Sequence, residues 1–247
     1  MPDNFTCLLW GSPGSGKTTM ASTAPPPIFL IDVDNKASMM HNLFPSIEKG
    51  DLIIHPITSK LSNEPLKAVT KKIITAGSIK SVVTALPNGY YEICDLLTAI
   101  EAGTEVKEVK TIVLDSLTTV SQHLARLICH LACVPQMRLQ DWGAFGSVLE
   151  ELLSFLRSIP KNIIVIAHDT IVQDELTKVI EYLPLIGGRM KHQIGVAFEE
   201  IYFLKPIPSK DGVIYQALTQ NDGKRIARTS RNLPQFIPAT FDSWGKE

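Results

Sequence analysis

A glycine-rich segment near the N-terminus limits the possible folds of this chain more than any other feature. Positions 11–18 read GSPGSGKT after the apolar run 6–10, which satisfies the P-loop pattern G-x-x-x-x-G-K-[ST] at every fixed position. Glycines let consecutive backbone N–H groups turn toward a phosphate, and the helix that begins next adds its dipole. In a chain of 247 residues a chance match is expected about once in a hundred sequences. The segment therefore predicts a phosphate site at the end of a buried strand.

The side chains of this segment indicate how a nucleotide would be held. Lys17 would place its charge on the β- and γ-phosphates, and the Thr18 hydroxyl would ligate Mg²⁺. The predicted nucleotide-binding residues are Ser12, Pro13, Gly14, Ser15, Gly16, Lys17, Thr18 and Thr19. We therefore expect ATP and Mg²⁺ as the ligands of this loop.

A second strand end supplies the carboxylate that such a metal needs. Residues 111–114 are an apolar run that ends at Asp115. We predict that Asp115 holds the Mg²⁺, either directly or through its water ligands. The alternative is that Asp115 caps a helix that begins immediately after it.

Apolar runs alternate with helical patterns along the chain. Buried parallel strands are expected at 6–10, 28–31, 52–55, 111–114 and 162–167, and helices at 17–23, 90–101, 116–133 and 145–158. This alternation predicts an α/β fold with a mainly parallel sheet covered by helices on both faces.

The two regions outside this alternation carry different expectations. Segments 200–204 and 213–218 are strand-like and predict a C-terminal antiparallel hairpin. Residues 57–88 fit a hairpin or a small inserted subdomain. We expect one domain spanning 1–247, with the possible insertion at 57–88.

The composition limits where the protein works and what it binds. The chain has 24 basic and 25 acidic residues, so nucleic-acid binding would have to come from local patches. No apolar stretch reaches the roughly 18 residues of a membrane helix, and the N-terminus lacks a signal peptide. The 4 cysteines do not suggest a disulfide scaffold. We therefore expect a soluble, cytoplasmic protein without a membrane partner.

The strand at 28–31 and the acidic residues after it resemble the second core strand of RecA-type ATPases. In that family an acidic residue at this strand end activates the attacking water. The resemblance gives this role to Asp34, although the family usually carries Glu, and Asp32 could share the task. The alternative is that both carboxylates are merely solvated at the end of the strand.

Further downstream the sequence resembles the compact phage-type group of RecA-like ATPases. The resemblance rests on 141–143, the helix after it, and the strand that ends at His168. It implies that His168 senses the γ-phosphate and that Arg228 and Arg231 reach the nucleotide of a neighbouring subunit. His168 could instead be an ordinary polar strand end, and the two arginines part of a solvated or DNA-facing loop. The predicted catalytic residues are Lys17, Asp34, Asp115, His168, Arg228 and Arg231.

The same resemblance implies a function. Known members of the group are ATPases that coat single-stranded DNA, promote recombination or strand annealing, and work with a single-strand binding protein. It implies that this chain forms a filament or ring, with ATP between subunits and DNA-stimulated hydrolysis. The expected DNA contacts are Lys178, Arg189, Lys191 and His192, with further lysines at 60, 67, 71, 72 and 80.

Two other functions remain open for a chain with this P-loop. One is a remodelling ATPase of the helicase-loader kind, whose main partner is another protein. The other is a small-molecule P-loop kinase. Such kinases usually close an arginine-rich lid over the phosphates, and the sequence between Asp115 and His168 offers only Arg126, Arg138 and Arg157. The kinase is therefore the weaker alternative.

Overall fold

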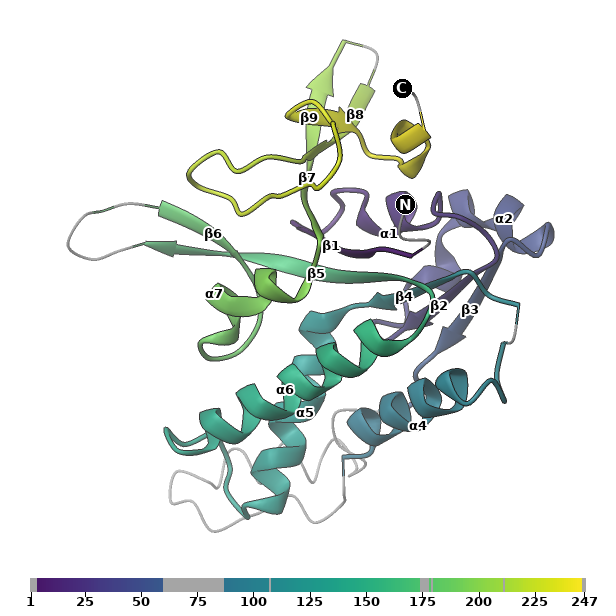
Figure 1. The fold of residues 1–247 in the computed structure, drawn as a ribbon. Helices are drawn as coiled ribbons and strands as arrows, with labels where there is room; N and C mark the ends of the chain where they lie inside the picture. Colours follow the sequence, from purple (N-terminus) through teal and green to yellow (C-terminus); the bar gives the residue numbers. More distant parts are fainter. Residues whose placement is uncertain are drawn as a thin grey trace.

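Figure 1 shows the computed structural model of the chain, which describes residues 4–59, 87–106, 108–173, 178, 180–210 and 212–245. Most of the segment 57–88, for which a hairpin or an inserted subdomain is predicted, lies outside the described residues. The lysines at positions 60, 67, 71, 72 and 80 lie outside them as well.

The described residues form one nine-stranded mixed sheet. Its parallel part has the order β3-β2-β4-β5-β1-β7. These strands are β1 (Thr6–Gly11), β2 (Ile28–Asp32), β3 (Leu52–Pro56), β4 (Thr111–Asp115), β5 (Asn162–Gln173) and β7 (Glu200–Ser209). Beyond β7, the strands β8 (Gly212–Leu218) and β9 (Phe236–Pro238) are antiparallel. The predicted fold class, a mainly parallel sheet with a C-terminal antiparallel hairpin, is confirmed.

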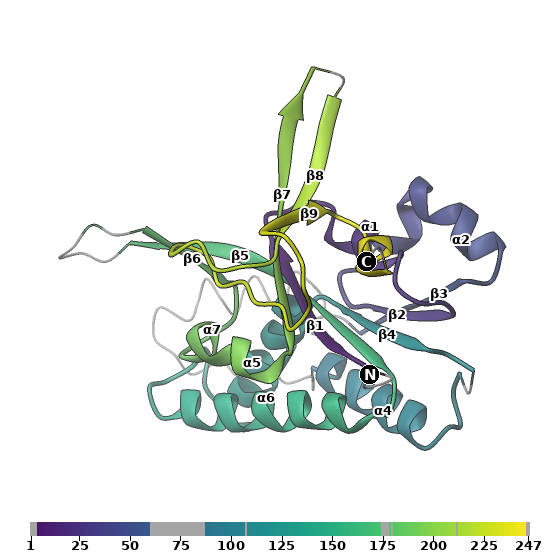
Figure 2. The ribbon, with the colours of Figure 1, turned by 45° about the horizontal axis from the view of Figure 1, so that its top comes forward.

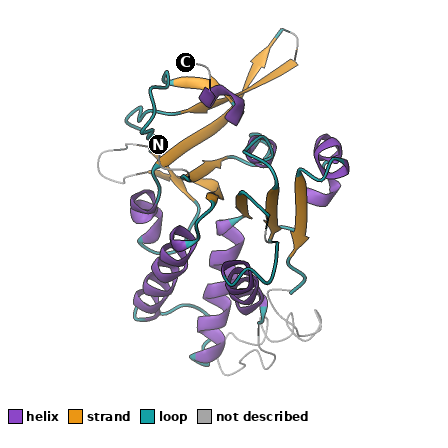
Figure 3. Ribbon diagram, turned by 45° about the vertical axis from the view of Figure 1, so that its right-hand side comes forward, coloured by secondary structure: helices purple, strands orange, loops and turns teal. Residues whose placement is uncertain are grey.

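Helices cover both faces of the sheet, as the alternating pattern predicts. The face that carries Leu8 and Trp10 packs against α4 (Gly89–Glu101), α5 (Leu117–Leu131) and α6 (Asp141–Ser158), which lie together on one side in Figures 2 and 3. The opposite face, with Cys7 and Leu9, packs against α1 (Lys17–Ala21) and η5 (Phe241–Gly245). The remaining short helices are η1 (Ala37–Met39), η2 (His41–Leu43), α2 (Phe44–Glu48), α7 (Met190–Gln193) and η4 (Ile194–Ala197).

One element differs clearly from its prediction. β5 continues past 167 to Gln173 and pairs antiparallel with β6 (Ile180–Pro184), although no strand is expected between 168 and 199. Figures 1 and 2 show this pair, and the β7–β8 hairpin, projecting from the body of the molecule. Ile171 is exposed because this arm extends beyond the helices that cover the sheet. An arm that faces water lacks the continuous apolar run by which buried strands are recognised.

The topology brings four strand ends to one edge of the sheet. The parallel strands β1, β2, β4 and β5 all point their carboxyl ends in the same direction, so the residues that follow them meet there. In register, Gly11 lies beside His168, and Asp32 lies beside Asp115. Among the described helices, none has both the length and the apolar character needed to cross a membrane.

Candidate active site

The loop between β1 and α1 depends on two glycines with left-handed backbone conformations. Gly14 and Gly16 have φ values of 76° and 88°, which side chains with a Cβ rarely adopt. A Cβ on Gly16 would lie 3.1 Å from a ring carbon of Tyr215, so β8 packs closely against this part of the loop. Nothing lies within 4 Å of the corresponding position at Gly14. The loop is therefore shaped as an open turn of backbone N–H groups, which suits an anion.

Lys17 is folded back onto this loop. Its side chain is buried, and Nζ donates to the carbonyl oxygens of Gly11 and Ser12, at 2.8 Å each. Burial lowers the pKa of Lys17 to about 8, although the carboxylate of Asp115 favours the charged form. A cation held mainly by carbonyl oxygens gains from an incoming phosphate, so Lys17 fits its predicted role.

Thr18 and Asp115 meet at the predicted metal position. The Thr18 hydroxyl donates to Asp115 Oδ2 at 2.6 Å. Burial raises the pKa of Asp115 to about 6; the hydrogen bond from Thr18 opposes the rise, and the carboxylates of Asp34 and Asp32 add to it. A hydroxyl and a carboxylate are the hard oxygen ligands that Mg²⁺ prefers in nucleotide sites, where phosphates and waters complete its shell. These two residues therefore fit the ion.

The helix after β4 is capped by a residue other than Asp115. Ser116 occupies the N-cap of α5, and its hydroxyl oxygen accepts from the backbone N–H of Thr119 at 3.4 Å. The alternative role for Asp115, capping this helix, is therefore taken by its neighbour. Asp115 keeps its side chain on the side of Thr18.

The two carboxylates after β2 have different environments. Asp32 is only 1% exposed and accepts hydrogen bonds from the backbone N–H groups of Lys36, at 3.2 Å, and Ala37, at 2.8 Å. It therefore stabilises the turn after β2. The side chain of Asp34 is 8% exposed and lies among polar side chains from other elements. Neither carboxylate is simply solvated, and Asp34 is the one that faces the loop of Lys17.

Three side chains hold the Asp34 carboxylate. Oδ1 accepts from the hydroxyls of Ser116, at 3.0 Å, and Thr119, at 2.5 Å, and Oδ2 lies 3.2 Å from Nε2 of His168. Burial alone would raise the pKa of Asp34, but the hydrogen bonds from His168, Thr119 and Ser116 outweigh it and hold the pKa well below its usual range. Asp34 is thus a firmly ionised group beside the P-loop.

His168 joins this cluster from β5. Its backbone N–H donates to the Thr118 hydroxyl at 3.0 Å, and its ring is 22% exposed. Nδ1 has no hydrogen-bond partner among the described residues. Lys36 adds a charge from the other side, with Nζ 3.7 Å from Asp34 Oδ2. His168 therefore lies between the P-loop and Asp34, a position compatible with contact to a γ-phosphate.

These groups surround one cavity of about 310 Å³. Its lining residues are Pro13, Gly14, Ser15, Gly16, Lys17, Thr18, Thr19, Asp34, Lys36, Ala37, Met40, Asp115 and His168. The volume is at the lower end of the range for small-molecule sites. All seven of the predicted nucleotide-binding residues after Ser12 are brought together here with Asp34, Asp115 and His168.

The two predicted arginine fingers lie elsewhere. Arg228 forms an isolated β-bridge with Ile201, near the start of β7. Its guanidinium donates to the carbonyl oxygens of Gly195 and Phe198. The Arg231 guanidinium lies 3.8 Å from the ring centroid of Trp244. Neither residue lines the cavity of its own subunit, which leaves a role on a neighbouring subunit as a prediction.

The four predicted DNA contacts are also outside the cavity. Lys178 is exposed near the turn of the β5–β6 arm, and Arg189 is exposed at the start of α7. His192 is exposed on α7, whereas Lys191 is half-buried. They lie on two neighbouring elements, since α7 follows β6 along the chain and packs near it.

Several residues of the site are missed by the sequence reasoning. Besides Ser116 and Thr119, Asp169 accepts a 2.9 Å hydrogen bond from the Ser12 hydroxyl, and Tyr215 packs on Gly16. The Ser/Thr-rich run after Asp115 is visible in the sequence and could have suggested hydroxyl donors. The Tyr215 contact has no such sequence pattern, because it depends on how the β7–β8 hairpin folds over the loop.

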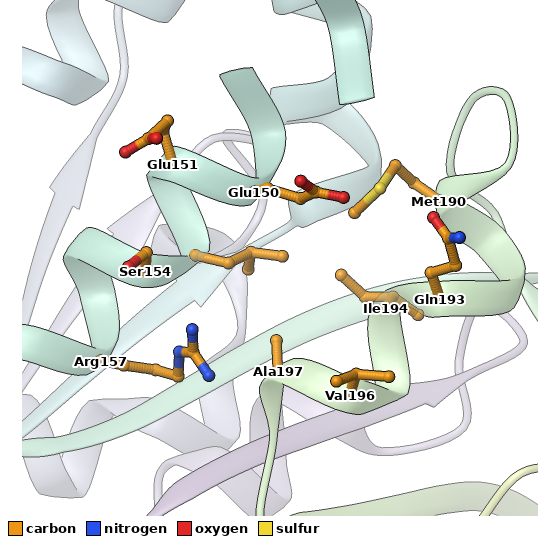
Figure 4. Close-up of a pocket in the computed structure, with 10 residues that line it drawn as sticks. Glu150, Glu151, Ser154, Arg157, Met190, Gln193, Ile194, Val196 and Ala197 are labelled. Atoms are coloured by element: carbon orange, nitrogen blue, oxygen red, sulfur yellow. The ribbon is translucent and has the colours of Figure 1, made fainter. Parts of the chain in front are cut away.

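A second depression, of about 480 Å³, lies between α6 and the α7–η4 segment. Figure 4 shows Glu150 and Arg157 along one side of it and Met190 and Val196 along the other. It shares no lining residue with the cavity at the P-loop. The two depressions are therefore separate.

Comparison with known proteins identifies the family of this chain. No curated protein matches the chain. The KaiC-like protein PH0186 of Pyrococcus horikoshii OT3 is a similar solved structure, with 14% identity, 95% of this chain and 84% of that chain covered, and a TM-score of 0.47. The flagellar accessory protein FlaH of Methanocaldococcus jannaschii is another similar structure, with 12% identity and a TM-score of 0.41. The match covers 96% of this chain and 85% of that chain. A family of AAA domains matches residues 3–233. The chain belongs to this AAA domain family and is a P-loop ATPase.

Proposed function

We propose that the protein hydrolyses ATP in the presence of Mg²⁺, with Asp34 as the residue that orients and activates water. The observation that carries this proposal is the position of Asp34: its buried, ionised carboxylate shares one cavity with Lys17, Thr18 and Asp115. A carboxylate in this place can accept a hydrogen bond from a water molecule near the terminal phosphate.

Each residue of the cavity has a distinct part in this reaction. The backbone of the P-loop binds phosphate oxygens, and Lys17 exchanges its carbonyl partners for them. Mg²⁺ held by Thr18 and Asp115 would neutralise charge on the phosphates. Asp34 orients the water that attacks the γ-phosphorus; the bond to the bridging oxygen breaks, ADP leaves, and the water proton passes to Asp34 or to the phosphate. His168 would contact the γ-phosphate from β5.

The test is ATP turnover by the purified chain and by Asp34→Asn. The amide keeps the size of the carboxylate but cannot accept a proton, so we expect the variant to bind Mg²⁺-ATP and to lose hydrolysis. A matched control is Asp95→Asn, the same change at an exposed carboxylate of α4 outside the cavity. Full turnover by Asp34→Asn would refute the proposed role of Asp34.

We further propose that ATP binding controls self-association and binding of single-stranded DNA, as the resemblance to the phage-type group implies. Two features support this. Lys178, Arg189 and His192 are exposed on adjacent elements, where backbone phosphates could be contacted. The two arginines expected near the nucleotide lie outside the cavity of their own subunit, so they could act only on a neighbour's site.

The DNA proposal is tested by salt-dependent binding to an oligonucleotide of mixed sequence, with and without a non-hydrolysable ATP analogue. We expect tighter binding with the analogue, and a slope against log salt that decreases when Lys178 and Arg189 are replaced by Ala. Equal affinity with and without nucleotide would contradict the coupling. Turnover that rises with a small phosphate acceptor, and not with DNA, would instead favour the kinase.

A further inference from the structure

We infer that Thr119 is a positioning residue for ATP hydrolysis, which fixes the carboxylate of Asp34 so that Oδ2 faces the cavity. The inference rests on the role of Asp34 proposed above. Thr119 lies in the first turn of α5, and its hydroxyl donates to Asp34 Oδ1 at 2.5 Å. Thr119 is 85 positions from Asp34 in the chain, so this contact joins the loop after β2 to the helix after β4.

The two oxygens of Asp34 have different surroundings. Oδ1 accepts two hydroxyl hydrogen bonds, from Thr119 and from Ser116 at 3.0 Å. Oδ2 lies 3.2 Å from the His168 ring and 3.7 Å from Nζ of Lys36. Both of these partners line the cavity, whereas Ser116 and Thr119 do not. The hydroxyl pair therefore determines which oxygen remains on the side of a bound nucleotide.

The backbone around Asp34 explains why the side chain needs this support. Asp34 lies two residues beyond β2, and its N–H donates a long 3.3 Å hydrogen bond to Asp115 O. The next residue, Asn35, has a positive φ of 54° and belongs to the turn. The carboxylate is therefore carried by a turn outside the sheet, and rotation about its side-chain bonds is limited mainly by its hydrogen-bond donors. A catalytic group gains rate from being held in a productive orientation.

Thr119 separates positioning from structure better than Ser116 does. The Ser116 hydroxyl donates to Asp34 and also accepts from the Thr119 N–H as the N-cap of α5. Its removal would weaken the helix as well as the carboxylate contact. Among the described residues, the hydrogen-bond partners of the Thr119 hydroxyl are Asp34 and, at 3.4 Å, Ser116 Oγ. Thr119 is thus the residue whose hydroxyl can be removed with the least effect on the fold.

The experiment compares Thr119→Val, Thr119→Ser and a control variant in the full chain. Valine keeps the shape of threonine without the donor, and serine keeps the donor. The control is Thr98→Val on α4, where an exposed threonine donates to Cys94 O at 2.9 Å. For each protein, kcat and KM for ATP, the affinity for a non-hydrolysable analogue, and the melting temperature are measured.

We expect Thr119→Val to lower kcat by about ten- to a hundredfold, the effect of losing one hydrogen bond to a charged group. KM and analogue affinity should stay close to those of the unaltered protein, and the melting temperature should fall by only a few degrees, because Asp34 keeps the Ser116 donor. Thr119→Ser should keep kcat within about threefold of the unaltered protein's, since the hydroxyl remains. Thr98→Val should match the unaltered protein in kcat, KM, analogue affinity and melting temperature. A hydroxyl with a purely structural role would not give a lower kcat at unchanged KM, nor would serine restore the kcat.

The Asp34→Asn variant, measured in parallel, separates this inference from the proposed function. If Asp34→Asn loses turnover and Thr119→Val keeps it, the positioning role is overturned and the role of Asp34 remains. If Asp34→Asn keeps turnover, both are overturned. A fall in analogue affinity that matches the loss of kcat in Thr119→Val would also overturn the inference. So would failure of Thr119→Ser to restore kcat.

Discussion

The hydroxyl of Thr18 donates a 2.6 Å hydrogen bond to the carboxylate of Asp115, which lies 97 residues further along the chain. The contact joins the start of α1 to the end of β4, although β5 lies between β1 and β4 in the sheet. Both oxygens are suitable ligands of Mg²⁺. The contact therefore places two metal-binding groups from separate segments of the chain next to each other.

Metal binding should weaken in mild acid. Burial raises the pKa of Asp115 to about 6, and a carboxyl group must be deprotonated to ligate a metal. Above that pH the carboxylate is available; below it, protons compete and Mg²⁺ affinity should fall by up to about tenfold per pH unit. Calorimetric titration of Mg²⁺ with an ATP analogue between pH 5 and 8 measures this. Asp115→Asn should bind Mg²⁺ weakly at every pH, and equal affinity of the unaltered protein at pH 5 and 7 would contradict the prediction.

Lys17→Ala should lose nucleotide binding and keep its fold. In the structure Nζ contacts loop carbonyls and a hydroxyl rather than an ion-pair partner, so its removal leaves no buried charge without a partner. We expect affinity for the ATP analogue to fall by about ten- to a hundredfold or more, with an unchanged circular dichroism spectrum. Lys49→Ala, which removes an exposed lysine outside the cavity, is the matched control and should bind normally. Retained affinity in Lys17→Ala would argue against the P-loop as the phosphate site.

The sequence predicts the body of this fold well because its signals are local. The five core strands are continuous apolar runs, and the P-loop pattern lies in one segment of the chain. Parallel strands then bring Asp34, Asp115 and His168 to one edge by topology alone. The roles given to these residues stay predictions, but their meeting in one cavity is what the resemblance implies.

The parts that are not predicted depend on contacts between distant segments. The outer part of the β5–β6 arm is exposed, and Tyr215 reaches Gly16 only because the β7–β8 hairpin folds over the loop. Likewise, nothing local shows that Thr119 turns toward Asp34, since a Ser/Thr-rich helix start is usually explained by capping. Such contacts require the packed structure.

A steric contact between two helices gives a test of the fold away from the site. A Cβ added to Gly89, at the start of α4, would lie 2.1 Å from Nδ1 of His123. His123 is buried on α5 and has little room to move. Gly89→Ala should therefore lower the free energy of unfolding by about 1–3 kcal/mol, the usual cost of overpacking.

Gly143→Ala is the matched control for that substitution. Gly143 lies in α6, and nothing is within 4 Å of the added Cβ. Because alanine is the better helix former, the variant should be as stable as the parent or up to about 1 kcal/mol more stable. Urea denaturation followed by circular dichroism measures both variants. Equal effects of the two substitutions would show that α4 and α5 are not packed as described.

The arginine finger is best tested by mixing two inactive variants. Arg228 is the better candidate for this test, because Arg231 lies 3.9 Å from the buried Glu200 and stacks on Trp244, so its removal would disturb the fold. Lys17→Ala lacks a working P-loop but keeps Arg228, and Arg228→Ala has the reverse defect. Each alone should be nearly inactive, since a finger contributes about 10³-fold or more to hydrolysis.

If Arg228 acts on a neighbouring subunit, an equal mixture of the two variants should recover activity. An interface is competent when an Arg228→Ala subunit supplies the P-loop and a Lys17→Ala subunit supplies the arginine, which random assembly gives at about a quarter of interfaces. Arg157→Ala is the control, because Arg157 lines the same surface depression as Arg228 and has no predicted role; it should be active without mixing. A mixture as inactive as its components would mean that Arg228 does not complete a neighbour's site, because about a quarter of the interfaces in the mixture combine an intact P-loop with an intact Arg228.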